Sequence, residues 1–435
     1  MSRLRSLIIF LFVLFLGYPI SAKETECIVS QSLADSLAKE QVIYRNRIAP
    51  FHTVALDITR KLTGGTGYNN LDAVRFAMSL SMYPDYWKEV PYIKVENKAL
   101  LDSLGIEHGD KVAPSLLFGD KGDLILNELW TEGNGHTNDA VLSLYGKVTI
   151  IEMLQTNSLY TPLSVTRHRP LPSWRIGLEI FYNNANFSGW CFIMTFIVAF
   201  AGTVLCFIKK YKVNLFLYLL VSLVGILSFA LRWIIGRHIP LEGGEQVMMF
   251  TYMILSLIAS SLTLKDPWIA NGCMYMGGFT ALVARLSVKE YIITTLSPAL
   301  SSPWLAFHVS VIMISYALLA VLLPISIYLI YTKNKITEIE RTSLVLNLSG
   351  VIMLGAGIIL GALWAKEAWG SYWSWDPKEN WAAITFFAYL IPLVLYKSIK
   401  SKPQVYGWLL IISFSAMVIT YFGVNFMSSL HSYGT

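Results

Sequence analysis

Residues 362–383 read ALWAKEAWGSYWSWDPKENWAA and connect the end of one long apolar segment to the start of the next. Five of the 13 tryptophans of the chain lie in this stretch, where an even distribution over 435 residues would place fewer than one. Asp376, Pro377 and Glu379 have the residue types of an N-cap, a first and a third helical position, which is a capping-box arrangement. The stretch therefore predicts an aromatic loop, residues 364–381, whose end begins a new helix.

Apolar segments like these two continue through the C-terminal half of the chain. Overall, 54% of the residues are hydrophobic, 14% are charged and the mean hydropathy is +0.52, whereas soluble domains carry about 25% charged residues. A helix needs about 20 apolar residues to cross a bilayer. We therefore expect an all-α polytopic membrane protein in a lipid bilayer, with about eight transmembrane helices. The eight apolar segments are 189–208, 213–235, 244–264, 267–287, 304–331, 342–364, 381–396 and 405–426.

The charged residues divide the chain into two parts. Residues 23–188 carry 35 charged side chains in 166 positions, and residues 189–435 carry 25 in 247 positions. The first part has a composition close to that of a soluble domain, and the second is the predicted membrane domain. Because the first part has a net charge of −3, the total of +6 arises elsewhere, and no nucleic-acid partner is expected.

The N-terminus has the pattern of a secretory signal peptide. Two arginines precede the mostly apolar run Leu7–Ile20, and two small residues follow it. The run is shorter than the about 20 residues of a membrane span. We expect residues 1–22 to direct residues 23–188 to the outer side of the membrane, either as a cleaved signal peptide or as a retained anchor.

Positive charges on the predicted loops support the same orientation. With residues 23–188 outside, the loops on the cytoplasmic side carry ten Lys or Arg residues, and those on the outer side, with the adjoining span ends, carry six. The aromatic loop then lies on the outer side as well. We expect a multi-pass protein of the bacterial inner membrane, with residues 23–188 and the loop 364–381 on the periplasmic side.

The pattern of the predicted exported half, residues 23–188, indicates a mostly helical domain of unknown role. Apolar residues have helical spacing over 30–48, 50–63 and 70–82. Residues 141–154 fit a strand or a helix, and residues 132–138 fit a polar loop. The four cysteines of the whole chain include no C-x-x-C pair, so no disulfide framework is expected. We interpret four scattered histidines as surface or structural residues: His52, His108, His136 and His168.

The tryptophan-rich loop fits two interpretations. Tryptophans at span ends commonly form an interfacial belt, but a belt alone would distribute them over all the ends. Residues two apart point the same way in an extended chain, so Trp373 and Trp375 would form one flat apolar wall. Gly370 and Ser371 give the preceding backbone the freedom to present it. Such a wall suits a large planar ligand with an apolar face and an acidic rim.

Three histidines lie at outer ends of the predicted spans. Ser302 and Pro303 fit the N-cap and first position of the fifth span, so His308 lies about 7.5 Å along that helix. His431 follows the eighth span, and His238 follows the second. Neutral imidazoles on opposite faces of a macrocycle ligate haem iron. His308 and His431 are the candidate pair, whereas His238 is either a further ligand or a structural or gating residue, and a plain interfacial role is the alternative for each.

These residues resemble a known family. The stretch WGSYWSWDPKENW, residues 369–381, closely resembles the WWD signature of the haem-handling proteins of cytochrome c biogenesis, and its DPKE continuation resembles the CcsA (ResC) type of system II. The segment 297–318, which holds His308, and the terminal LHSYG, which holds His431, resemble the segments that carry the two outer haem-ligand histidines of that family. The resemblance covers about residues 213–435.

The resemblance implies a component that binds haem b in transit and presents it for covalent attachment to the C-x-x-C-H motif of apocytochrome c. It implies holocytochrome c synthase (haem lyase) activity shared with a separate CcsB (ResB) type subunit. His308 and His431 would ligate the iron, and Trp369, Trp373 and Trp375 would bind the porphyrin face. Asp376 would shape the loop or contact the haem edge. Two cations are candidate partners for the haem propionates through charge-assisted hydrogen bonds: Arg237 or Lys378.

One departure from the family pattern concerns the span after the loop. The family often has a further histidine there, but residues 386–397, FFAYLIPLVLYK, contain none. Either haem enters without that ligand or a partner subunit supplies it. The alternatives to attachment are a haem exporter or chaperone, a solute transporter with an aromatic gate, and a structural scaffold.

Overall fold

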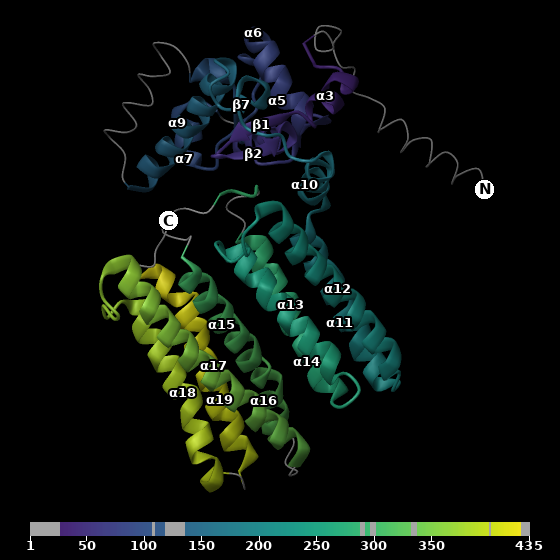
Figure 1. The fold of residues 1–435 in the computed structure, drawn as a ribbon, viewed down its shortest axis with the longest axis vertical. Helices are drawn as coiled ribbons and strands as arrows, with labels where there is room; N and C mark the ends of the chain where they lie inside the picture. Colours follow the sequence, from purple (N-terminus) through teal and green to yellow (C-terminus); the bar gives the residue numbers. More distant parts are fainter. Residues whose placement is uncertain are drawn as a thin grey trace, which may run out of the picture. The chain divides into compact units, whose positions relative to one another are not determined.

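The computed structural model describes residues 27–106, 109–117, 135–287, 292–295, 302–331, 337–399 and 402–427. It divides into two compact units, residues 1–180 and residues 181–435, which are considered separately below (Figure 1). The predicted signal peptide, residues 1–22, lies outside the described residues, as do His108 and His431.

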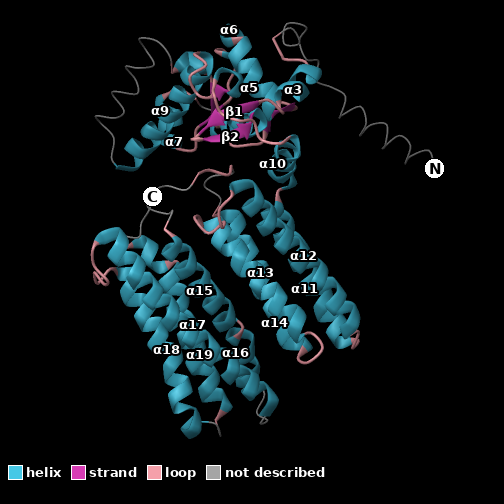
Figure 2. Cartoon of the chain, viewed as in Figure 1, coloured by secondary structure: helices cyan, strands magenta, loops and turns pink. Residues whose placement is uncertain are grey.

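The N-terminal unit combines helices with three small antiparallel sheets (Figure 2). The largest sheet has three strands in the order β2-β1-β7, and the others pair β3 with β4 and β5 with β6. The last helix of this part, α10 (Ser173–Ala185), crosses the boundary between the units. The remaining elements, in chain order, are α3 (Gln31–Leu37), β1 (Gln41–Tyr44), β2 (Arg47–Pro50), α4 (Phe51–Thr63), β3 (Gly67–Tyr68), β4 (Leu71–Asp72), α5 (Ala73–Met82), α6 (Pro84–Trp87), β5 (Ile93–Lys94), α7 (Lys98–Ser103), β6 (Lys111–Val112), η1 (Pro114–Leu116), α9 (Gly135–Gln155), β7 (Thr161–Pro162) and η2 (Leu163–Val165).

Two of the three helices predicted for this half are confirmed, and the third is wrong beyond its first turns. Helices α4 and α5 match the predictions over 50–63 and 70–82. The predicted helix 30–48 is helical only over α3, after which β1 and β2 form a hairpin. Its turn residues, Arg45 and Asn46, have φ of 47° and 61°, as the two central positions of a tight hairpin turn require.

The core of this unit forms around α4, in which 11 of 13 residues are buried. His52 is one of them and therefore lies in the core rather than on the surface. Four aromatic rings, those of Tyr68, Phe76, Trp87 and Tyr92, pack with centroids 5.3–6.3 Å apart, mostly edge to face. Residues 141–154 take the helical alternative, within α9, which also includes residues 135–138 of the predicted polar loop.

A buried ion pair ties α10 to the sheet and to α4. The two terminal guanidinium nitrogens of Arg47, on β2, donate to the Glu179 carboxylate, and the Thr53 hydroxyl donates to the same group at 2.7 Å. The side chain of Glu179 is only 2% exposed. Removing one partner of such a pair leaves an uncompensated buried charge.

The membrane unit is a set of long helices in two groups (Figure 1), the first formed by α11 to α14 and the second by α15 to α19. In the first group α14 packs against both α11 and α13; in the second α15 packs against α17, and α19 packs against α16 and α18. The helices are α11 (Phe187–Phe207), α12 (Tyr211–Gly236), α13 (Gly244–Leu262), α14 (Pro267–Leu286), α15 (Pro303–Ala320), α16 (Leu322–Tyr331), α17 (Thr337–Trp369), α18 (Pro377–Ile399) and α19 (Pro403–Tyr421), followed by the short turn η4 (Gly423–Phe426).

Seven helices in the described residues are long and apolar enough to cross a membrane, which makes this a multi-pass membrane protein. They correspond to seven of the eight predicted segments. The segment predicted at 267–287 forms the 20-residue helix α14, which is not among the seven. Its buried positions are largely small or polar, among them Ala270, Asn271, Gly277 and Gly278, so its mean hydropathy is low. These residues pack inside the helix group, where close approach matters more than apolarity.

The fifth predicted span is interrupted. It consists of α15 and α16, which meet at Val321. Pro324 has no N–H to donate to the carbonyl of Ala320, and its ring clashes with that carbonyl, which explains the break.

We predict that Glu179→Ala destabilises the N-terminal unit by about 3 kcal/mol, because it leaves the Arg47 guanidinium buried without its carboxylate. Hydrogen–deuterium exchange of the full-length protein in detergent measures this, as faster exchange in α4 and α10. The control Glu152→Ala removes an exposed carboxylate and should change exchange little. Equal protection in both variants would show that the pair contributes nothing.

Candidate functional site

A cavity of about 250 Å³ lies in the membrane unit. Its walls come from α15, α17, the aromatic loop with the first turns of α18, the end of α19, and the segment between α12 and α13. The cavity therefore collects residues that are up to 179 positions apart in the sequence, from Leu241 to Thr420. Its lining is mostly apolar, with His308, Lys378, Glu242, Tyr372 and Glu379 among its polar members.

His308 is held in a defined orientation on the wall of the cavity. Its Nδ1 lies 2.7 Å from the main-chain oxygen of Gly357 on α17. A carbonyl oxygen only accepts, so Nδ1 carries a proton, and in the neutral imidazole Nε2 then carries the lone pair. This is the tautomer that a metal-ligating imidazole adopts when its other nitrogen donates to the backbone.

Glycines on α17 allow this approach. A Cβ on Gly361 would lie 2.7 Å from Cε1 and 2.8 Å from Nδ1 of His308, so only glycine accommodates the ring. The hydroxyl of Ser315, on α15, also donates to the Gly350 oxygen at 2.8 Å. The close contacts between α17 and α15 pair Gly350 with Leu319, Gly357 with Ile312 and Gly361 with His308.

The predicted capping box at the start of α18 is confirmed. The Lys378 N–H donates to Asp376 Oδ2 at 3.1 Å, and the Asp376 N–H donates to Glu379 Oε2 at 3.2 Å. The loop is fastened further because the Ser374 N–H donates to Glu379 at 2.8 Å and the Asn380 amide donates to the Trp375 oxygen at 2.8 Å. The predicted start of α15 at Pro303 is also confirmed, but the Ser302 hydroxyl donates to Glu367 rather than capping the helix.

The prediction that Trp373 and Trp375 form one flat wall is wrong. Their rings are 6.3 Å apart at 85° to each other, because Trp375 has a φ of 60° and the chain is not extended there. Trp373 lines the cavity, whereas Trp375 is 77% exposed. Trp364 is buried and also lines the cavity, with Trp369 packed against it at 4.8 Å and 67°. The tryptophans that line the cavity are thus Trp364 and Trp373, and Tyr316 and Tyr372 are its other aromatic lining residues.

Of the other two predicted histidines, His238 does not line this cavity. His431 lies outside the described residues. His238 has Nδ1 3.4 Å from the Ile239 oxygen and Nε2 3.3 Å from the Thr294 oxygen, with Glu242 at 3.6 Å. Both of its nitrogens face oxygen acceptors, which fits the structural alternative.

Several lining residues were not singled out from the sequence. Glu242 joins the cavity from the first helix group, and Gly361, Tyr316 and Thr420 join it from the second. A glycine in a long apolar helix is a weak signal for close packing, and no local signal distinguishes the other three.

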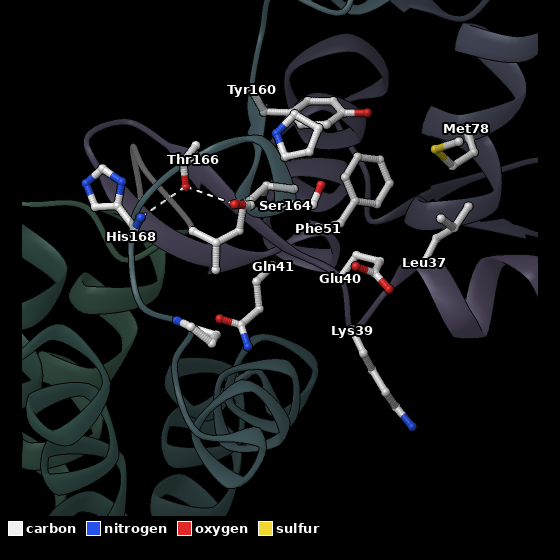
Figure 3. Close-up of a pocket in the computed structure, with 14 residues that line it drawn as sticks. Leu37, Lys39, Glu40, Gln41, Phe51, Met78, Tyr160, Ser164, Thr166 and His168 are labelled. Atoms are coloured by element: carbon white, nitrogen blue, oxygen red, sulfur yellow. Dashed lines mark hydrogen bonds between the residues drawn. The ribbon is translucent and has the colours of Figure 1, made fainter.

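A second, larger cavity lies in the N-terminal unit (Figure 3). It has a volume of about 710 Å³ and is lined by apolar residues such as Phe51, Met78 and Tyr160 on one side and by Thr166 and His168 on the other. Burial raises the pKa of Tyr160, so its phenol stays protonated at neutral pH. The described residues contain no group of three His, Cys, Asp or Glu side chains that could hold a metal ion, here or elsewhere.

Comparisons with known proteins point to one family. The sequence profile of the family described as cytochrome C assembly protein matches residues 215–431. The cytochrome c biogenesis protein CcsA of Welwitschia mirabilis is 31% identical over 56% of this chain and 94% of its own length. CcsA of Prochlorococcus marinus is 30% identical over 66% of this chain and 98% of its own length.

Two further similarities differ in their coverage. Protein NrfI of Wolinella succinogenes is 25% identical over 89% of this chain and 53% of its own length, so this chain corresponds to about half of that protein. Among solved structures, cytochrome c haem lyase CcmF matches with a TM-score of 0.47 and 16% identity, over 61% of this chain and 49% of its own.

We predict that Asp376 acts through its side-chain oxygen as a helix cap. Asp376→Asn retains an oxygen acceptor for the Lys378 N–H and should leave the loop unchanged, whereas Asp376→Ala should cost about 1 kcal/mol. Hydrogen–deuterium exchange of peptides covering residues 370–380 measures the difference. If Asn and Ala loosen the loop equally, the negative charge matters rather than the cap.

Proposed function

Because the chain belongs to the cytochrome c assembly protein family, we propose that it binds haem at the cavity beside the tryptophan-rich loop and presents it for covalent attachment to apocytochrome c. The observation that carries the proposal is the imidazole of His308, which lines an aromatic cavity in the tautomer that leaves its lone pair on Nε2. Haem is here the substrate in transit. CcsA relatives carry a role in cytochrome c biogenesis in their names.

The residues present fit a haem. Nε2 of His308 supplies an axial ligand, and the rings of Trp364 and Trp373 supply apolar surface for the porphyrin face. Small-molecule cavities typically measure 300–1,000 Å³, so a ligand of haem size extends beyond this cavity of about 250 Å³. His431, which the family resemblance assigns as the second ligand, completes the coordination in this proposal.

The reaction asks the protein chiefly for positioning. In each thioether bond, a substrate cysteine loses its S–H proton, sulfur bonds to one vinyl carbon, and the other vinyl carbon gains a proton, so atoms and electrons balance without an oxidant. Holding the vinyl edge beside two thiols converts an encounter into an intramolecular step. The substrate's C-x-x-C-H histidine then replaces one axial imidazole on release. The chain itself needs no C-x-x-C pair for this chemistry, and it has none.

The proposed setting is a bacterial inner membrane, with the loop 364–381 and residues 23–188 on the periplasmic side. The positive-inside distribution of Lys and Arg supports this orientation. A CcsB (ResB) type subunit is the proposed partner, and synthase activity is shared with it. An exporter or chaperone would bind haem in the same cavity but would not yield covalent cytochrome c when this chain and its partner are the only biogenesis proteins present.

We predict that His308→Ala loses most of its bound haem, because the iron loses an axial ligand. The measurement is the reduced absorption spectrum of the detergent-purified protein, in which the wild type shows the sharp bands of six-coordinate haem. Added imidazole should partly restore the bands in the variant. His168→Ala, which removes an exposed histidine of the N-terminal unit, is the control. Unchanged haem content in both His308→Ala and His431→Ala would refute the proposal.

A second prediction concerns the glycine that faces the histidine. In Gly361→Ala the new Cβ would come within 3 Å of the His308 ring and displace it, so haem affinity should fall about 10-fold or more. Haem titration followed by absorbance gives the affinity. Gly146→Ala, at a helical glycine with open space around it, should bind haem as the wild type does. Equal affinity in all three proteins would mean that His308 does not hold the iron.

A further inference from the structure

Lys378 is the one described residue of the cavity lining with an ammonium group. It is the second residue of α18, directly after Pro377, and it lines the same mostly apolar cavity as His308. Within the described residues, no carboxylate oxygen lies within 4.0 Å of its Nζ. The protein therefore holds a partly buried cation at this site without a close ion pair.

The carboxylates that share the cavity are engaged elsewhere. Glu379 accepts the N–H groups of Ser374 and Asp376. Glu242 accepts from the Gln246 amide at 3.3 Å and lies 3.6 Å from His238. Neither carboxylate forms an ion pair with the Lys378 ammonium. The carboxylate whose charge acts on Lys378 is that of Asp376 at the helix start, which accepts the Lys378 backbone N–H. No carboxylate oxygen within 4.0 Å occupies the ammonium itself.

The position of Lys378 in the helix strengthens this conclusion. Lysine is unfavourable in the first turn of a helix, because the positive end of the helix dipole lies there. It is unfavourable again in an apolar cavity, where a charge loses hydration. A bound anion relieves both costs, since it interacts with the ammonium and with the helix terminus together.

Of the two cations considered as partners for the haem propionates, only Lys378 lines the cavity. Arg237 ends α12 with a φ of 61° and donates its N–H to the Trp233 oxygen. It is not part of the cavity wall. The structure thus distinguishes two candidates that the sequence left equal.

We propose that Lys378 binds a propionate carboxylate of the haem and thereby fixes the orientation of the macrocycle, an inference that rests on the proposed function. Haem carries its two carboxylates on one edge and its vinyl groups on other edges. Anchoring a carboxylate at Lys378 turns the vinyl groups away from this residue. Lys378 is then a positioning residue, which decides which edge of the haem is offered to substrate thiols.

The test compares haem b with haem dimethyl ester, in which both carboxylates are esterified. Each is titrated into the full-length detergent-purified protein, and the ratio of the two affinities is measured. The wild type should prefer haem about 10-fold or more, because a charge-assisted hydrogen bond is lost with the ester. In Lys378→Gln the ratio should approach one, and Lys378→Arg should restore much of the preference.

The controls separate this inference from the proposed function. Lys397→Gln removes an exposed lysine near the other end of the same helix and should keep the wild-type ratio. Because the readout is a ratio, a variant with reduced occupancy remains informative. If haem binding requires His308 but Lys378→Gln keeps the wild-type preference, the role of Lys378 is refuted and the proposed function stands. If the wild type binds neither compound, both fall.

Discussion

The hydrogen bond between Nδ1 of His308 and the main-chain oxygen of Gly357 is the interaction on which the cavity depends. It fixes the ring, the tautomer and the direction of Nε2 in one contact. It forms only because α15 and α17 approach closely, and glycines on α17 make that approach possible. In a bilayer, where apolar burial does not drive helix association, small residues at the contact surface take over that role. The glycines of α17 therefore determine both the packing of α15 against α17 and the orientation of the His308 imidazole.

The second constraint is the capping box that begins α18. The oxygens of Asp376 and Glu379 accept backbone N–H groups on both sides of the helix start. They thus fasten the loop that carries Trp373 and fix the first turn that carries Lys378. Asp376 and Glu379 are thus used to build the loop, and Lys378 lines the cavity. A purely interfacial belt of tryptophans needs no such fastening, since belt residues act singly at the membrane surface.

The sequence predicted the features that depend on neighbouring residues. It did not predict those that depend on contacts between residues far apart in the chain. The capping box, the ends of α4 and α5, and most long apolar helices follow from patterns of a few neighbouring residues. The prediction of a flat wall of Trp373 and Trp375 failed because the backbone at Trp375 is left-handed, and the planes of the two rings lie at 85° to each other. The prediction of a helix over 30–48 failed because the residues of β1 and β2 fit a helical pattern equally well. Only the turn residues Arg45 and Asn46 indicate the hairpin. Contributions such as that of Glu242 arise from packing between helix groups, which no local pattern contains.

The two cavities lie in different units and are lined by different chemical groups. The larger one, of about 710 Å³, lies in residues that the family profile does not match, and the CcsA proteins of Welwitschia mirabilis and Prochlorococcus marinus cover 56% and 66% of the chain. The smaller one lies almost wholly in α15 to α19 and in residues 215–431, and it alone combines an oriented imidazole, two tryptophans and an ammonium group. Volume is a poor guide to function here, because a planar ligand with a metal centre needs an axial donor and an apolar face more than it needs enclosure. The proposed haem site therefore rests on donor chemistry, and it falls in the residues that the family profile matches.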